Sequence, residues 1–256
     1  MFDIAAVRRR LRSTRFANVR YVDETDSTND DAAALLSDPA GSGTIIVAGY
    51  QRHGRGRRGR RWVAPPGTAL LFSAVLPDAV TASHLWSVSF WCALAVSDGI
   101  TAATEIVTTL QWPNDLLLGT RKVCGILTTS RVVGDLGWAA CGVGLNVLRA
   151  QSSAEGEPYA AYLSDAASSV SREDTFVSIV EAMDRWLPAL RSAPSVAREW
   201  ERRAGLPGER YRVQIDGEPI PFEGSALRLD DDGALILRVN GEERRAAMAE
   251  ARVLRT

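Results

Sequence analysis

With 256 residues, of which 46% are hydrophobic and 24% charged, the chain is long enough for one large globular domain, or for one domain with a small appendage. Thirty basic residues against 31 acidic ones give a net charge of −1, which argues against a generally basic nucleic-acid-binding protein. Cys92, Cys124 and Cys141 stand singly in apolar runs, so neither a disulfide framework nor a zinc site is indicated. Since no run approaches the roughly 20 apolar residues of a membrane span, and no signal sequence is recognisable, we expect a cytoplasmic protein.

The predicted elements begin with a strand and the start of a helix. Residues 19–23 alternate in polarity, as a half-buried strand does. Ser27 and Thr28 stand three residues before Asp30 and Asp31, a spacing typical of capping boxes. Hydroxyls and free N–H groups at a helix N-terminus can instead hold a polar ligand group, and both interpretations stay open.

The apolar, β-branched run 44–50 predicts a buried strand that leads directly into residues 51–62, QRHGRGRRGRRW. This loop contains six arginines and three glycines. Glycine permits close backbone approach and guanidinium groups suit carboxylate and phosphate, so the loop predicts an anion-binding site. We expect the loop to be poorly ordered without its ligand and to close when its charge is neutralised. The alternatives are a solvated basic loop and an Arg-Gly RNA-binding segment.

After the arginine loop, two apolar elements are predicted. Residues 68–76 have the composition of a buried strand, and residues 83–102 have a long helical pattern. Trp86, Phe90 and Trp91 lie at helical spacing in that segment, which indicates core side chains rather than contacts to a cofactor.

A sharp bend and a single lysine follow. Residues 110–118, LQWPNDLLL, place Trp-Pro-Asn-Asp between two apolar segments, where Asn and Asp bond their own backbone or a ligand. The next strand starts at Lys122, and all the other basic residues of the chain are arginines. A planar guanidinium cannot imitate a compact ammonium, so Lys122 is a candidate for a specific role, with chance as the alternative. A hairpin would bring Asn114 and Lys122 into one neighbourhood.

The strand predicted over residues 137–147 contains Gly142, Gly144 and Asn146. Glycines in a strand leave room for a group against the backbone, although a bulge or bend is an equally simple explanation. Residues 151–158 have the composition of a polar loop.

The C-terminal part is predicted to be a small separate unit. Residues 172–203 are helical in pattern, with interruptions at Pro188 and Pro194, and Gly-Leu-Pro-Gly at 205–208 marks a boundary. The last 50 or so residues alternate as short strands, which predicts a small β-barrel appendage that needs docking for stability. Its turns are predicted at 216–217, 232–233 and 240–241.

Five motifs occur in a fixed order along the chain: Asp26-Ser27-Thr28-Asn29, Gln51 with GRGRRGRRW, WPND at 112–115, KVCGIL from Lys122, and GVGLN at 142–146. In this order they resemble the bacterial biotin protein ligases, which attach biotin to a carboxylase carrier domain. The resemblance covers nearly the whole chain. It implies an α+β fold with a mixed, class II synthetase-like β-sheet domain flanked by helices over 1–205 and a small SH3-like β-barrel over 206–256.

The resemblance also implies roles for individual residues. Lys122 and Arg57 would be catalytic, with Lys122 between the biotin carboxylate and the α-phosphate of ATP. Biotin would be bound by Ser27, Thr28, Asn29, Gln51, Gly54, Arg55, Gly56, Arg57, Lys122 and Gly125. ATP would be bound by Arg58, Arg60, Trp62, Asn114, Lys122 and Asn146. Mg²⁺ would accompany ATP, and its protein ligands are not identified by the sequence.

The implied reaction has two steps. The biotin carboxylate attacks the α-phosphate of Mg-ATP, giving biotinyl-5'-AMP and pyrophosphate, and a lysine of the biotin carboxyl carrier domain then attacks the mixed anhydride. A closed arginine loop would protect the adenylate from water. Neither of the two histidines is required, so a histidine-based triad or zinc site is not expected.

Two features depart from the family. Gln111 stands where the family usually has a lysine directly before WPND, so we expect weaker affinity for ATP. About 25 residues precede Ser27, too few for the helix-turn-helix domain of many relatives, so we expect a monofunctional ligase that does not bind DNA. Edge strands would allow a homodimer. The rival functions are a lipoate or octanoate ligase of related fold and a non-enzymatic Arg-Gly nucleic-acid-binding protein.

Overall fold

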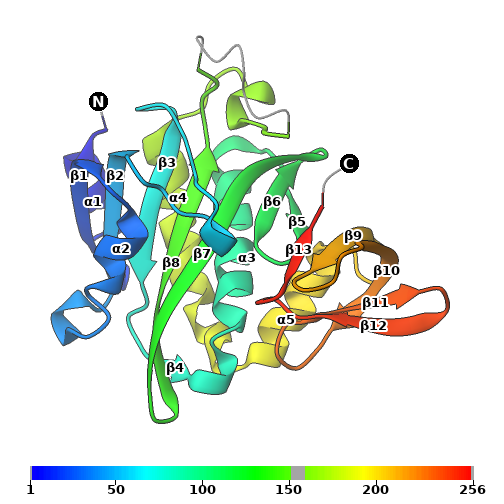
Figure 1. Cartoon of the computed structure of the whole chain (residues 1–256). Helices are drawn as coiled ribbons and strands as arrows, with labels where there is room; N and C mark the ends of the chain where they lie inside the picture. The colour runs from blue at the N-terminus through cyan, green and yellow to red at the C-terminus, as the bar shows by residue number, and fades with distance from the viewer. Residues whose placement is uncertain (1, 151–158, 255–256) are drawn as a thin grey trace.

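The computed structural model describes residues 2–150 and 159–254, which form two β-sheets with helices packed around the larger one (Figure 1). The larger sheet has eight strands in the order β1-β2-β3-β8-β7-β6-β5, with β4 paired to β8. It is mixed, because β1 and β2 are parallel and the other neighbours are antiparallel. Its strands are β1 (Asn18–Thr25), β2 (Thr44–Gln51), β3 (Ala69–Val75), β4 (Val80–Thr81), β5 (Thr109–Gln111), β6 (Asp115–Leu118), β7 (Arg121–Val133) and β8 (Leu136–Asn146).

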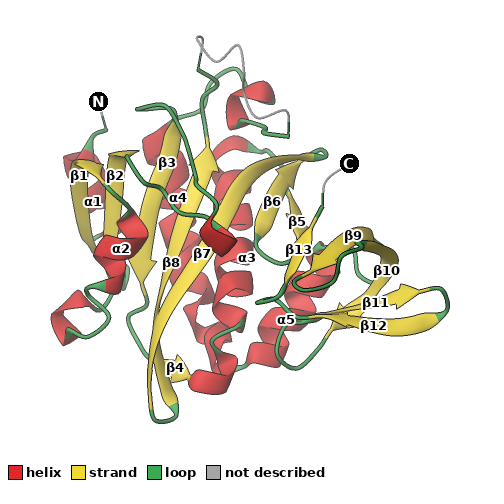
Figure 2. Ribbon diagram, in the orientation of Figure 1, coloured by secondary structure: helices red, strands yellow, loops and turns green. Residues whose placement is uncertain are grey.

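The two faces of this sheet are covered unequally (Figure 2). Successive side chains of a strand point to opposite faces, so Ile45 and Val47 of β2 join the main core whereas Ile46 joins a small second cluster. The main core contains side chains of the long helices behind the sheet, and the second cluster contains Ala32 of the short helix in front. The helices are α1 (Ile4–Leu11), α2 (Thr28–Ala33), α3 (Ser87–Thr104), α4 (Arg172–Trp186) and α5 (Ala193–Arg203). The short α2 leaves much of the front face free for a site.

The C-terminal segment forms a five-stranded antiparallel sheet in the order β12-β11-β10-β9-β13. Its strands are β9 (Arg210–Ile215), β10 (Phe222–Leu229), β11 (Leu235–Val239), β12 (Glu242–Ala246) and β13 (Ala251–Val253). The predicted docking is visible at Trp112, whose backbone N–H donates to the Tyr211 hydroxyl (3.4 Å) and whose indole N–H donates to the Gly233 carbonyl (3.0 Å). Buried side chains of both sheets belong to one continuous core. The division at residue 205 stays a prediction.

Several local predictions are confirmed. The strands expected at 19–23, 44–50, 68–76 and 137–147 are present, and Cys92, Cys124 and Cys141 are buried free thiols. Pro188 and Pro194 mark the expected interruptions, and each stands in the first turn of a new helical segment, where its missing N–H is not needed. The polar loop expected at 151–158 lies outside the described residues.

Two local predictions are wrong. The long helix begins at Ser87 rather than 83, because residues 82–84 form a separate 3-10 turn. The capping boxes at Ser27 and Thr28 are not formed: Ser27 is the N-cap of α2 but makes no side-chain capping bond. The Asp30 carboxylate pairs with Arg55 and that of Asp31 accepts from Thr25, so neither returns to the helix terminus.

Candidate functional site

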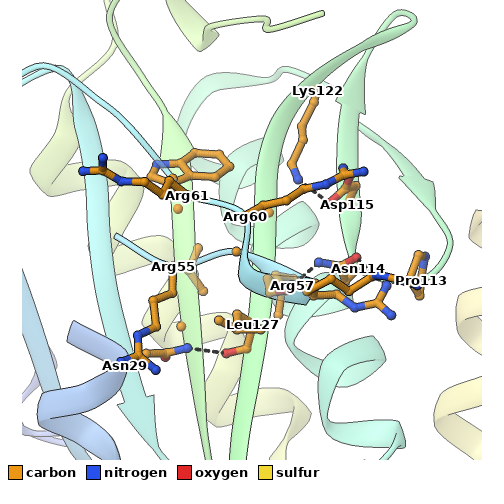
Figure 3. Close-up of a pocket in the computed structure, with 18 of the residues that line it drawn as sticks. Asn29, Arg55, Arg57, Arg60, Arg61, Pro113, Asn114, Asp115, Lys122 and Leu127 are labelled. Carbon is orange, nitrogen blue, oxygen red and sulfur yellow. Dashed lines mark hydrogen bonds and ion pairs between the residues drawn. The ribbon is translucent and has the colours of Figure 1, made fainter. Parts of the chain in front are cut away.

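A cavity of about 340 Å³ lies on the α2 face of the main sheet, where the arginine loop folds over it (Figure 3). Its floor follows from the alternation along β8, because Cys141, Val143 and Leu145 belong to the core behind the sheet while Gly142 and Gly144 face the other way. Gly125 of β7 is paired with Gly144 and also lines the cavity. Three glycines therefore give this part of the sheet a floor without side chains.

One end of the cavity is neutral and polar. Ser27, Thr28 and Asn29 at the start of α2 are each more than nine-tenths buried, and together with Gln51 at the end of β2 they line this end. The Gln51 side-chain oxygen accepts from the Thr28 backbone N–H (2.7 Å) and hydroxyl (3.0 Å). The Asn29 amide donates to the Leu127 carbonyl (3.0 Å). The side chains of Thr28 and Asn29 therefore bond neighbouring strands and not the helix terminus, and the interpretation that this segment holds a polar ligand group stays a prediction.

The arginine loop is a compact hairpin. The Gly56 N–H donates to the Arg60 carbonyl (2.7 Å), and the Trp62 N–H donates to the Gly54 carbonyl (2.8 Å). Between them residues 57–59 form one 3-10 turn, in which Arg58 has φ 60° and Gly59 has φ 72°. Left-handed backbone favours glycine, which explains Gly59 in the motif. The predicted ordering of this loop on ligand binding stays a prediction.

Two arginines of the loop are tied to the C-terminal sheet. The Arg57 guanidinium bonds the Met248 carbonyl and the Asn114 side chain, the latter at 3.3 Å. The Arg58 guanidinium donates to the Glu250 carbonyl (2.7 Å) and forms an ion pair with Asp216. Burial lowers the pKa of Arg57, Asp115 opposes that change, and the neighbouring cations Arg58 and Arg60 add to it. An arginine stays charged in spite of such shifts, so the loop delivers fixed positive charge.

The single lysine of the chain lies among these groups. Lys122 Nζ is 2.6 Å from Asp115 Oδ1, and both side chains are largely buried. The hairpin of β6 and β7 brings them together, as the sequence predicted for the bend and Lys122. Asn114 is fixed in the same bend. Its side-chain amide donates to the Ile126 carbonyl (2.6 Å), and its backbone carbonyl accepts from the Ile126 N–H (2.9 Å).

Trp62 lies over the glycine floor. A β-carbon built on Gly144 would come within 2.5 Å of the Trp62 ring, and one built on Gly125 would come within 3.0 Å of it. Lys122 Nζ is 5.5 Å from the centre of the same ring, a cation–π distance. The prediction that glycines leave room for a group against the strand backbone is therefore confirmed at Gly144. The group that lies there is the indole of Trp62.

Most of the residues predicted from the sequence line this one cavity. They are Ser27, Thr28, Asn29, Gln51, Arg55, Gly56, Arg57, Arg58, Arg60, Trp62, Asn114, Lys122 and Gly125. Gly54 and Asn146 do not line it. Gly54 closes the hairpin, where a β-carbon would lie 2.5 Å from the Trp62 carbonyl, and the buried Asn146 amide donates to the Ala161 carbonyl (3.1 Å). Both therefore have supporting positions in this structure.

Sequence reasoning missed further lining residues. The WPND bend predicted that Asp115 bonds its own backbone or a ligand, but not that its carboxylate holds Lys122. Arg252, Val253 and Leu254 reach the cavity from β13 and the residue after it. Nothing in their local pattern distinguishes them, because only the docking of the C-terminal sheet brings them there. Arg61, Gln111, Trp112, Pro113, Ile126, Leu127, Gly142, Val143, Gly144 and Tyr159 complete the lining.

The arrangement can hold two anionic groups side by side next to a neutral head group. Guanidinium groups from the loop and from β13 supply positive charge on one side, and the ammonium of Lys122 is held beside them. The neutral end offers hydroxyl and amide groups at fixed positions, so it suits a small polar ring. No group of three or more His, Cys, Asp or Glu side chains that could hold a metal occurs within residues 2–150 and 159–254.

Known proteins with this sequence pattern decide the family. The model of the family described as "Biotin/lipoate A/B protein ligase family" matches residues 21–146 of the chain. The chain is 35% identical over 228 residues to the biotin--[acetyl-CoA-carboxylase] ligase of Paracoccus denitrificans. The matched region covers 84% of this chain and 91% of that protein. The chain belongs to the biotin protein ligase family. The ligase of the same name from Mycobacterium tuberculosis is 31% identical, with coverage of 86% of this chain and 83% of that protein.

A solved structure of another biotin protein ligase agrees with this fold. The biotin protein ligase from Aquifex aeolicus in complex with biotin and ATP superposes with a TM-score of 0.76, covering 93% of this chain and 99% of that one at 24% identity. The α+β architecture that the resemblance implied, with a mixed sheet flanked by helices and a C-terminal β unit, is thus confirmed for this member of the biotin protein ligases.

Proposed function

We propose that this protein is an ATP-dependent ligase that activates biotin as biotinyl-5'-AMP and transfers the biotinyl group to a specific lysine of a biotin carboxyl carrier domain. Membership of the biotin protein ligase family supports this function. The observation that carries it is the position of Lys122. Its ammonium is held by Asp115 in the same cavity that contains the neutral polar end and the arginine loop.

In the first step an oxygen of the biotin carboxylate forms a bond to the α-phosphorus of ATP, and the bond to pyrophosphate breaks. The carboxylate and the phosphates repel each other, and the transition state accumulates negative charge. Lys122 neutralises charge where the two anions meet, and Arg57, fixed by Asn114 and Met248, adds a second cation. Arg58 and Arg60 contact the phosphates, and the Trp62 ring stacks on adenine once it moves from the glycine floor.

In the second step the amine of the carrier lysine attacks the carbonyl carbon of the mixed anhydride, loses a proton, and AMP leaves. The neutral end, with Ser27, Thr28, Asn29 and Gln51, holds the ring of biotin by hydrogen bonds. The hairpin of the arginine loop covers the anhydride and limits hydrolysis until the carrier arrives.

Mg²⁺ fits this site as a companion of ATP. Mg²⁺ is usually bound through one or two carboxylates together with substrate phosphates, not by a dedicated protein cage. Asp115 is the one carboxylate among the described residues that line the cavity, and it would hold the ion together with the phosphates. When bound, the ion neutralises phosphate charge and assists the departure of pyrophosphate.

The shape and polarity of the cavity favour biotin over a plain acyl chain. A lipoate or octanoate ligase needs an apolar channel for its substrate, whereas here hydroxyl and amide side chains line one end of the cavity. The Arg-Gly nucleic-acid alternative is disfavoured because Arg55, Arg57 and Arg58 bond other parts of the same chain and fold over a cavity.

A direct test is whether ATP with biotin, but neither alone, yields a tightly retained acyl-adenylate. Titration of biotin, lipoate and octanoate in ATP–pyrophosphate exchange then identifies the acid. Exchange supported equally by octanoate would contradict the biotin assignment. Binding of RNA with a steep salt dependence, and no adenylate, would favour the nucleic-acid alternative.

The remaining expectations belong to the same proposal. The acceptor is a biotin carboxyl carrier domain of an acyl-CoA carboxylase, and residues 1–205 and 206–256 are the catalytic and C-terminal units. No helix in the described part of the chain is long and apolar enough to cross a membrane. A cytoplasmic location, a homodimer and the absence of DNA binding stay predictions.

A further inference from the structure

A buried hydroxyl lies directly beneath the polar end of the cavity. Ser73 of β3 is fully buried and does not line the cavity itself. It sits on the α2 face of the sheet, because its neighbours Phe72 and Ala74 belong to the core on the other face. No motif in the sequence singles it out.

Ser73 contacts two side chains that do line the cavity. Its Oγ lies 2.9 Å from Thr28 Oγ1 and 2.9 Å from Asn29 Oδ1. The Asn29 amide nitrogen donates to the Leu127 carbonyl, so its oxygen is the atom that faces Ser73. The Thr28 hydroxyl donates to Gln51, so toward Ser73 it acts as an acceptor. Ser73 therefore shares its single proton between two acceptors, Thr28 Oγ1 and Asn29 Oδ1, in a three-centre hydrogen bond.

The same oxygen of Asn29 is also confined by the neighbouring strand β8. Gly142 is the cross-strand partner of Ser73, and a β-carbon on Gly142 would lie 2.2 Å from Asn29 Oδ1. The Asn29 amide is thus packed between the Gly142 backbone, the Ser73 hydroxyl and the Leu127 carbonyl. A ligand at this end meets donors and acceptors whose directions are set from below.

We propose that Ser73 is a positioning residue that sets the hydrogen-bonding polarity of the cavity's neutral end and so selects the cyclic urea of the substrate. This inference rests on the proposed function. A urea ring presents one acceptor oxygen and two N–H donors, so it is recognised only by side chains whose donors and acceptors alternate correctly. Without the Ser73 proton, Thr28 and Asn29 lose the contact that orients them, and each buried oxygen lacks a donor.

The test is Ser73→Ala, assayed by ATP–pyrophosphate exchange. One lost hydrogen bond of typical strength corresponds to roughly tenfold in affinity, so KM for biotin rises roughly tenfold. KM for ATP stays within about twofold, because Ser73 contacts no group at the arginine side. In 2-iminobiotin a nitrogen donor replaces the urea oxygen. The analogue preference, which is the ratio of kcat/KM for biotin to kcat/KM for 2-iminobiotin, falls roughly tenfold in Ser73→Ala. Ser73→Cys keeps a weaker donor at the same place and gives intermediate values.

The matched control is Ser97→Ala, which removes another buried hydroxyl. Ser97 belongs to helix α3, away from the cavity, and its Oγ lies 3.0 Å from Thr108 Oγ1. This control leaves both KM values and the analogue preference unchanged. The inference is overturned if Ser73→Ala behaves as Ser97→Ala does, or if KM for biotin and for ATP rise together. If Ser73→Ala does not fold, an unchanged analogue preference in Ser73→Cys overturns it. A wild-type protein that forms no adenylate from biotin refutes instead the proposed function.

Discussion

Replacing Lys122 with alanine removes the only ammonium from a site that otherwise contains guanidinium groups. Lys122 Nζ lies 2.6 Å from Asp115 Oδ1, and neither side chain is more than a quarter exposed. The substitution therefore deletes a positive charge and leaves the carboxylate of Asp115 in the cavity without that cation. Both changes disfavour the approach of a carboxylate to a phosphate.

The magnitude follows from simple electrostatics. At an effective dielectric constant of about 20, two unit charges about 4 Å apart interact by about 4 kcal/mol. Removing one preorganised donor from a site that stabilises developing negative charge typically lowers kcat by about 10²–10³-fold, equivalent to about 2.7–4 kcal/mol. The two estimates agree, so Lys122→Ala is expected to reduce biotin-dependent ATP–pyrophosphate exchange by about 10²–10³-fold.

The assay measures the initial rate of exchange at saturating ATP and biotin, with folding checked by thermal unfolding. Arg131→Ala is the matched control, because it removes one exposed cation from the same strand β7 outside the candidate site, and wild-type exchange is expected. A rate for Lys122→Ala within about threefold of wild type would refute the role of the ammonium.

Three further changes test how the site is held together. Asp216→Asn removes the ion pair with Arg58 and is expected to speed trypsin cleavage within residues 52–61. The free energy of unfolding should fall by less than about 1 kcal/mol. An unchanged rate of cleavage would show that the ion pair does not restrain the loop. Trp112→Phe loses the buried bond to the C-terminal sheet and should lower the unfolding free energy in urea by about 1–3 kcal/mol, and a loss near zero contradicts that docking contact. Hydrogen bonding to Arg202 lowers the pKa of Glu199 from 4.5 to about 2, so the stabilising contribution of the Glu199 carboxylate is present above about pH 4.5 and is lost as pH falls toward 2. The Tm of wild type should therefore exceed that of Glu199→Gln above pH 4.5, and the difference should shrink as pH falls toward 2. A difference in Tm that stays constant across this range would exclude the linkage.

The sequence by itself determined the elements and most of the side chains of the site. Alternating polarity predicted the strand at 19–23, and apolar runs predicted those at 44–50 and 68–76. In β8 every second residue faces away from the core, and Gly142 and Gly144 stand at such positions. The composition of residues 51–62 predicted an anion site, and the lone lysine predicted a special cation. These signals are local, because charge, chain flexibility and side-chain period are properties of short segments.

Only the tertiary structure decided what those side chains contact. The local sequence at Ser27 and Thr28 allowed helix capping or a ligand contact. In the fold the Thr28 hydroxyl bonds Gln51 and Ser73 of neighbouring strands and does not cap the helix. The ties of Arg57 to Met248 and of Trp112 to Gly233 join segments more than 100 residues apart, and no local pattern encodes such pairs. The buried hydroxyl of Ser73 looks like any strand serine until folding places it under the cavity, because packing distance is independent of distance along the chain.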